Sequence, residues 1–186
     1  MFVAAVPSEA AIADLARFVE PRLDDGGPLR WTSQDQWHLT LTFLPAVPDD
    51  SLDELCDQLA ATALRRQALA LSLSGAGAFP NPARAKALWL GVHGDTDALA
   101  HLATGTRNAA VRSGTEVDGS RFRPHLTLAR LGRPIDVTRW LRIFDSYAGP
   151  SWAVDDIALV ESHLGEGPRG RPRYRTHATF PLLGQA

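Results

Sequence analysis

The sequence has almost no lysine, a single cysteine and no long hydrophobic run. Arginine supplies 18 of the 19 basic residues, and Lys86 is the other one. Because 21 acidic residues offset them, the formal net charge is −2, which excludes a strong positive field over the whole molecule. Any contact with a nucleic acid must therefore be local. Arginine suits such contacts, since its planar guanidinium group matches the geometry of a phosphate.

The single cysteine and the lack of long apolar segments also bear on the cell compartment. Cys56 cannot form a disulfide within the chain, and no spacing of cysteine and histidine resembles a zinc site. The first residues lack the basic start and the sustained apolar run of a signal peptide. We therefore expect a cytoplasmic protein that has no membrane segment and binds no metal.

Hydrophobic periodicity predicts helices that alternate with strands. With 45% hydrophobic and 22% charged residues, the 186-residue chain has the composition of an ordinary globular domain. Apolar residues at spacings of three and four predict helices at residues 12–19, 52–59, 99–110 and 137–144. Runs typical of strands occupy residues 2–6, 38–44, 69–73, 87–92, 125–131 and 157–163. This order indicates the α+β class.

The series strand, helix, strand, helix, strand occurs twice. The first strands lie 86 residues apart, from Phe2 to Leu88, and a repeated histidine recurs after 87, from His38 to His125. We therefore expect one bilobal domain in which an approximate twofold axis brings the two histidine strands together around a central cleft. Its parts are a first half at about 1–80, a second half at about 84–164 and a C-terminal strand region at 165–186, which together span 1–186.

The tetrapeptide His-Leu-Thr-Leu begins each of these two histidine strands. Because side chains alternate across a strand, His38 and Thr40 share one face while the leucines take the core, and His125 and Thr127 repeat the pattern. One copy alone is most simply an ordinary hydrogen-bonded histidine. The chance of an identical second copy at a chosen position is on the order of one in ten thousand or rarer. A duplication that preserved packing residues would explain the leucines better than the histidines.

Two histidines and two threonines in one cleft suit phosphoester chemistry. An imidazole titrates near neutral pH, so one ring can remove a proton while the other supplies one. Threonine hydroxyls can donate hydrogen bonds to the phosphate oxygens, where negative charge builds during attack. No metal or cofactor is required by this arrangement. We therefore predict His38, Thr40, His125 and Thr127 as the catalytic residues.

Five segments of the chain together resemble the two-histidine (2H) phosphoesterase superfamily. They are the motifs WHLTLTFL and RPHLTLARL, the opening FVAAVP, the segment ALWLGV and the tail ALVESHL…RYRTHATFPL. Within it, the chain is similar to the bacterial RNA 2',3'-cyclic phosphodiesterases, or 2'-5' RNA ligases, of the LigT/ThpR family. The resemblance implies a LigT-like fold, with antiparallel sheets around the cleft and helices outside. It also implies metal-independent hydrolysis of a terminal 2',3'-cyclic phosphate to a 2'-phosphate, weak reversible 2'-5' ligation, and His38 as acid with His125 as base.

Four further residues are candidates for substrate binding. Family precedent makes Arg130 a phosphate ligand, but strict alternation turns it away from the catalytic face unless the strand ends or bulges there, and the alternative is a surface ion pair. Phe79 either stacks on a base or packs internally. Arg84, together with the arginines from 169 to 175, either guides the RNA backbone or is solvated, and Tyr174 is equally open.

Two other functions fit the same residues. The first is the same chemistry on a smaller molecule, such as ADP-ribose cyclic phosphate, and the second is a nucleotide-binding module without turnover. The intact histidines and threonines of both motifs favour an enzyme. The expected partner is RNA or an oligonucleotide with a 2',3'-cyclic phosphate end, and we expect a monomer.

Overall fold

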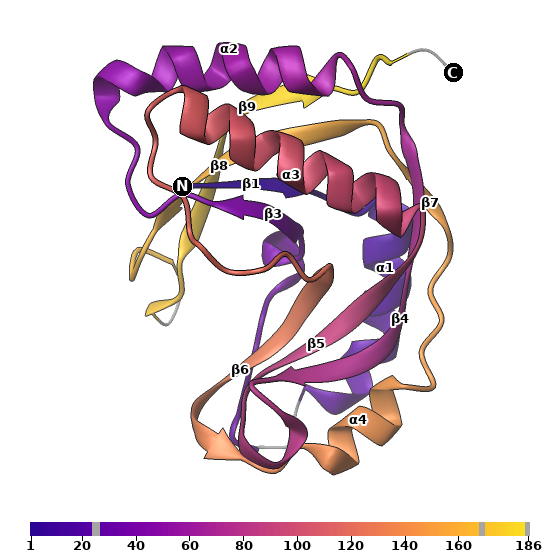
Figure 1. Ribbon diagram of the computed structural model, residues 1–186. Coiled ribbons are helices and arrows are strands. Elements are labelled where there is room, and N and C mark those ends of the chain that lie inside the picture. The colour runs from indigo at the N-terminus through magenta and orange to yellow at the C-terminus, as the bar shows by residue number, and fades with distance from the viewer. Residues whose placement is uncertain (24–26, 168–169, 185–186) are drawn as a thin grey trace.

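A curled antiparallel sheet forms the centre of the computed structural model, which describes residues 1–23, 27–167 and 170–184 (Figure 1). Within these residues the strands follow the order β7-β4-β5-β6-β3-β1-β8-β9, and β2 also pairs with β6. The strands are β1 (Phe2–Ala5), β2 (Leu29–Trp31), β3 (Leu39–Phe43), β4 (Leu69–Phe79), β5 (Ala85–Gly94), β6 (His125–Ile135), β7 (Trp152–Val154), β8 (Asp156–His163) and β9 (Arg173–Pro181).

Four α-helices pack against this sheet and complete the core. They are α1 (Glu9–Val19), α2 (Leu52–Ala63), α3 (Thr96–Arg112) and α4 (Thr138–Phe144). The helices α2 and α3 lie side by side, with α3 against β3 and β4 and α2 against β8 and β9 (Figure 1). The apolar stripe of each helix is buried in one hydrophobic cluster with the strand leucines, as Leu15, Leu59, Leu99 and Phe144 illustrate.

The α+β class is confirmed, with differences in the lengths and number of the strands. The four predicted helices and six predicted strands are present, and β4, β5 and β6 extend beyond the predicted runs. The short strands β2 and β7 were not anticipated, whereas β9 lies within the C-terminal strand region expected at 165–186. Arg173 and Arg175, which the sequence assigned either to RNA contact or to solvent, lie on β9, where they form ion pairs with Glu166 and Glu161.

The strand order is symmetric about the boundary between β3 and β6. On one side β5 and then β4 follow β6, and on the other β1 and then β8 follow β3. Because β4 closes the first sequence half and β8 closes the second, each half ends on a strand that pairs with the first strand of the other half. The two histidine strands therefore meet at the centre, through the pair Leu39 and Leu126.

Candidate active site

The meeting of β3 and β6 brings the four predicted catalytic residues into one cleft. His38 immediately precedes β3 and His125 opens β6. Both imidazoles, with Thr40 and Thr127, line a hollow with a volume of about 720 Å³. Two segments that are 87 residues apart in the sequence thus converge on one space, as the repeat predicted.

A backbone carbonyl fixes the orientation of the His38 ring. Its Nδ1 lies 2.7 Å from the carbonyl oxygen of Gln36, and its Nε2 lies 3.0 Å from the Oγ1 of Thr40. A carbonyl can only accept, so Nδ1 carries the proton and Nε2 accepts from the threonine hydroxyl. Phe2 stacks on the imidazole with 4.6 Å between the ring centroids, and the Tyr174 ring meets it edge-on at 5.5 Å.

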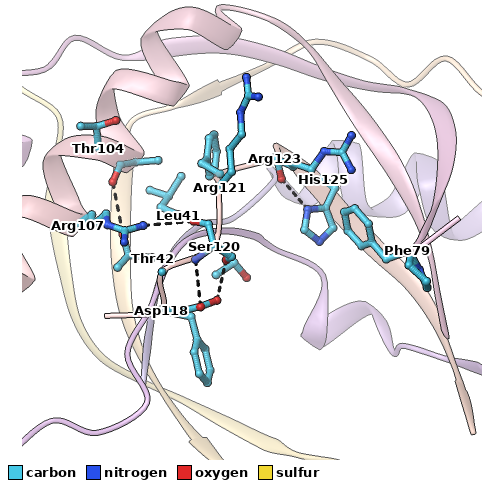
Figure 2. A pocket seen from close by; sticks show the side chains of 16 residues that line it. Leu41, Thr42, Phe79, Thr104, Arg107, Asp118, Ser120, Arg121, Arg123 and His125 are labelled. Carbon is cyan, nitrogen blue, oxygen red and sulfur yellow. Dashed lines mark hydrogen bonds between the residues drawn. The ribbon is translucent and has the colours of Figure 1, made fainter. Parts of the chain in front are cut away.

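A backbone carbonyl also fixes the orientation of the His125 ring. Its Nδ1 lies 2.7 Å from the carbonyl oxygen of Arg123, again two residues earlier in the chain, so Nε2 is left with a lone pair (Figure 2). The ring of Phe79 meets this imidazole edge-on at 4.9 Å, and Trp89 lies 5.9 Å away. Gly77 makes room for Trp89, since a Cβ at that glycine would lie 2.0 Å from the indole ring.

Burial lowers the pKa of both imidazoles. Loss of solvation is the main cause for each, and the positive charge of Arg130 lowers both pKa values further, against the opposing effect of the carbonyl hydrogen bonds. The pKa of His38 falls to about 4, and that of His125 falls by a smaller amount. Both rings are therefore predominantly neutral at pH 7 in the free protein, each with an Nε2 lone pair.

A bulge in β6 turns Arg130 into the cleft. The pairing with β5 passes from Thr127 to Ala129 and skips Leu128, and both Leu128 and Ala129 are buried. One inserted residue reverses the alternation, so Arg130 returns to the face of the catalytic residues and lines the cleft. Strict alternation would have turned Arg130 away, and the bulge is the exception that the sequence left open.

Of the other predicted binding residues, some lie at the cleft and others lie away from it. Tyr174 lines the cleft beside His38, and Phe79 lies beside His125. Arg84 lies exposed in the 3-10 turn Pro82–Arg84 and lines neither hollow that contains a catalytic histidine. Of the arginine-rich segment, Arg171 lines the cleft, whereas position 169 lies outside the described residues.

A second hollow, which the sequence did not reveal, adjoins the cleft. It has a volume of about 950 Å³ and shares Thr40 and His125 with the first. Figure 2 shows Arg107, Asp118 and Ser120 on one side of it and Phe79 and His125 on the other. Its residues come from β3, β4, α3 and the loop before β6, and no local motif joins segments so far apart.

The described residues show neither a metal cluster nor a membrane-spanning helix. No three histidine, cysteine, aspartate or glutamate side chains gather there as a metal site would need. In the same residues, no helix is both long and apolar enough to cross a bilayer.

Comparisons with known proteins agree on one family. Residues 6–166 match the 2'-5' RNA ligase superfamily. An RNA 2',3'-cyclic phosphodiesterase of Geobacillus stearothermophilus is 31% identical over 83% of this chain, which spans about half (48%) of that relative's length. The enzyme of the same name from Aeropyrum pernix is 29% identical, and the alignment covers 89% of this chain and 93% of the relative.

Solved structures show the same fold. TT0787 of Thermus thermophilus superposes with a TM-score of 0.80 and 26% identity, over 100% of this chain and 98% of that one. LigT of E. coli in complex with 3'-AMP superposes with a TM-score of 0.75 and 26% identity, over 97% and 96% of the two chains. The predicted LigT-like fold and the resemblance to the two-histidine family are confirmed.

Proposed function

The chain belongs to the 2'-5' RNA ligase superfamily, and from this premise we propose that it hydrolyses the terminal 2',3'-cyclic phosphate of RNA to a 2'-phosphate. One observation carries the proposal. The imidazoles of His38 and His125 line a single cleft, each with its Nδ1 held by a carbonyl and its Nε2 available for proton transfer. The names of the Geobacillus and Aeropyrum relatives support the same substrate class.

The reaction needs one proton removed and one supplied. A bond forms between a water oxygen and phosphorus while the bond between phosphorus and O3' breaks, which leaves the phosphate on O2'. One imidazole Nε2 takes the proton of the attacking water, and the other imidazole, protonated at Nε2, gives its proton to the departing O3'. No metal takes part in this scheme.

The surroundings favour His38 as the base and His125 as the acid. The acid must carry a proton before the reaction, and the imidazole with the less depressed pKa does so more readily. The pKa of His38, at about 4, is the more strongly lowered of the two. The negative charge of a bound phosphate raises both pKa values. This proposal reverses the order that the family resemblance implied.

Thr40, Thr127 and Arg130 bind the reacting phosphate in this proposal. The Thr127 hydroxyl has no hydrogen-bond partner among the described residues, and Thr40 bonds only with His38, so both can turn to a phosphate oxygen. Arg130 adds a positive charge and a planar pair of donors on the same face. These groups stabilise the negative charge that builds on the nonbridging oxygens.

The nucleoside next to the phosphate finds aromatic rings on both sides of the histidine pair. Phe79 lies beside His125 and Tyr174 beside His38, and Arg171 lines the cleft near them. Base stacking on such rings tolerates any base. We keep Phe79 and Tyr174 as proposed binding residues, whereas the position of Arg84 gives it no support in this role.

A direct assay separates the three functions that the sequence left open. Cytidine 2',3'-cyclic phosphate and a short RNA with the same cyclic end are supplied with EDTA present, and the position of the product phosphate is determined. We expect a 2'-phosphate from both, and reversible 2'-5' joining when an RNA with a free 5'-hydroxyl is added. Turnover of ADP-ribose cyclic phosphate alone would identify the small-molecule enzyme. Binding without hydrolysis between pH 5 and 9 would identify the binding module.

A single chain suffices for this chemistry. The catalytic residues and the groups that hold them all come from one copy, which supports a monomer as the working unit. The molar mass of the protein, measured by light scattering as it elutes from a size-exclusion column, tests this. The cytoplasm is the compartment that we propose, because Cys56 is a free thiol.

A further inference from the structure

β3 carries the same bulge as β6. The register of β3 against β1 skips Leu41, as the register of β6 against β5 skips Leu128. In both strands the skipped leucine and the residue after it are buried in succession. The next residue therefore returns to the face of the catalytic histidines. That residue is Arg130 on β6 and Phe43 on β3.

Phe43 presents its ring to solvent from a fixed backbone. The side chain is 48% exposed, and it belongs to neither hydrophobic cluster of the described residues. Its carbonyl accepts a hydrogen bond of 3.2 Å from the backbone N–H of Asp118, which ties the end of β3 to the loop before β6. A phenylalanine side chain has only two rotatable bonds, so it loses little conformational entropy when another flat group stacks on it.

The surroundings of Phe43 suit a nucleic acid strand. It lines the hollow of about 950 Å³ together with Phe79, Arg107, Arg121 and Arg123. Figure 2 shows these four neighbours around the hollow. These arginines outnumber the one carboxylate there, whose oxygens already accept from the N–H and hydroxyl of Ser120. Aromatic faces among cationic side chains are the elements that bind single-stranded RNA.

The position of Phe43 along the strand indicates which nucleotide it meets. It follows Thr40 by three residues, which corresponds to at most about 10 Å of strand. Phe79, whose ring lies 4.9 Å from that of His125, is nearer to the reacting phosphate. We propose that the hollow binds the second nucleotide from the 3' end of the RNA and that Phe43 stacks on its base. This inference rests on the proposed function, because it takes the cyclic phosphate to lie between the histidines.

The test compares two substrates that share the same cyclic end. One is cytidine 2',3'-cyclic phosphate, and the other is a trinucleotide that ends in it. For Phe43→Ala we expect the ratio of kcat/KM on the trinucleotide to kcat/KM on the mononucleotide to fall roughly 5- to 100-fold, the range of one lost base stack. Phe43→Trp should keep the wild-type ratio, because a larger ring can still stack. Val111→Ala, at an exposed apolar residue on α3, is the matched control and should keep both rates.

A ratio within twofold of wild type in Phe43→Ala would overturn the inference. Equal losses on both substrates would also overturn it, since they would place Phe43 in the support of the catalytic pair. If the wild-type protein hydrolyses neither substrate, the proposed function fails, and the inference is then read from binding alone. Fluorescence anisotropy of a labelled trinucleotide with a 2'-phosphate end should show weaker binding to Phe43→Ala than to Phe43→Trp. Equal binding by the two variants would reject it independently of catalysis.

Discussion

Just before β3, His38 lies against the ring of Phe2 and its Nε2 bonds with Thr40, whereas at the start of β6 the Nε2 of His125 has no partner among the described residues. The two strands share a tetrapeptide, a bulge and a carbonyl that holds Nδ1. What differs is the set of side chains around each imidazole. The repeated backbone thus fixes where the rings lie, and the neighbours decide how readily each one takes a proton.

Removal of either histidine tests whether catalysis needs the imidazoles of both strands, and it should cause the largest loss of activity. His38→Ala and His125→Ala should each lower kcat on cytidine 2',3'-cyclic phosphate by about 10²- to 10⁴-fold, because each proton transfer contributes that much. Circular dichroism should show an intact fold. His101→Ala, at an exposed position on α3, is the control. An activity close to wild type in either catalytic variant would rule out the paired mechanism.

A substrate with a better leaving group distinguishes the acid from the base. A 3'-deoxynucleoside 2'-(p-nitrophenyl phosphate) keeps the bond between phosphorus and O2' and releases, in place of O3', a phenolate that needs no proton. We expect His125→Ala to recover at least about tenfold on this ester relative to its loss on the cyclic phosphate, while His38→Ala stays equally impaired on both. Release of p-nitrophenolate gives the rates. The opposite pattern would restore the order that the family resemblance implied.

Substitution of Arg130 tests a charge that acts on both imidazoles, apart from the side chains that surround only one of them. Arg130→Met should reduce kcat/KM by about 10- to 100-fold, since a charge-assisted contact to the phosphate is lost. It should also raise the pKa of both imidazoles, because the neighbouring cation disfavours their charged form. An NMR titration of the ring protons measures this shift. Arg130→Lys should keep the imidazole pKa values near wild type yet recover only part of the rate.

Gly77→Ala changes the surroundings of His125 alone. The added methyl group would lie 2.0 Å from the ring of Trp89, so the indole must move. We expect a loss of about 1 to 3 kcal/mol in the free energy of unfolding, together with a lower kcat. Denaturant titration gives the first value. Gly119→Ala, where a Cβ meets no atom within 4 Å, is the control for stability, and an equal loss in both variants would contradict the packing argument.

The depressed pKa of His38 should appear in the pH dependence of stability. The unfolded imidazole binds a proton near pH 6.5, whereas the folded one does so only near pH 4, so the unfolded state gains protons first as the pH falls. The neutral His38 ring therefore contributes fully to the free energy of unfolding above about pH 6.5. This contribution is lost progressively towards pH 4, by up to about 3 kcal/mol. Denaturant titrations at several pH values measure it. His38→Gln should flatten the dependence, and an unchanged curve would contradict the burial argument.

The sequence predicted the elements that follow a regular period and the residues that it repeats. The alternation in His-Leu-Thr-Leu was enough to place each predicted catalytic histidine on the same face as its threonine, and the repeat was enough to predict that the two strands meet. Arg130 and Phe43 could not be oriented in this way, because each bulge depends on the register against a neighbouring strand. The order of strands in the sheet likewise depends on contacts between distant segments.

The hollow beside Phe43 was missed for a related reason. Its arginines come from α3 and from the loop before β6, and Phe79 comes from the end of β4. Each of these is unremarkable in its own segment. A signal was nevertheless present, since the exposed aromatic and the arginine occupy equivalent places in WHLTLTFL and RPHLTLARL.

The exchange of β4 and β8 between the two sequence halves makes each half depend on the other. A chain of half the length, with only the elements β1, α1, β3, α2 and β4, would present an unpaired edge on its first strand. Two such chains could satisfy that edge by donating their last strands to each other. Each half of the present chain likewise covers the first strand of the other half, so separately expressed halves should assemble only in each other's presence.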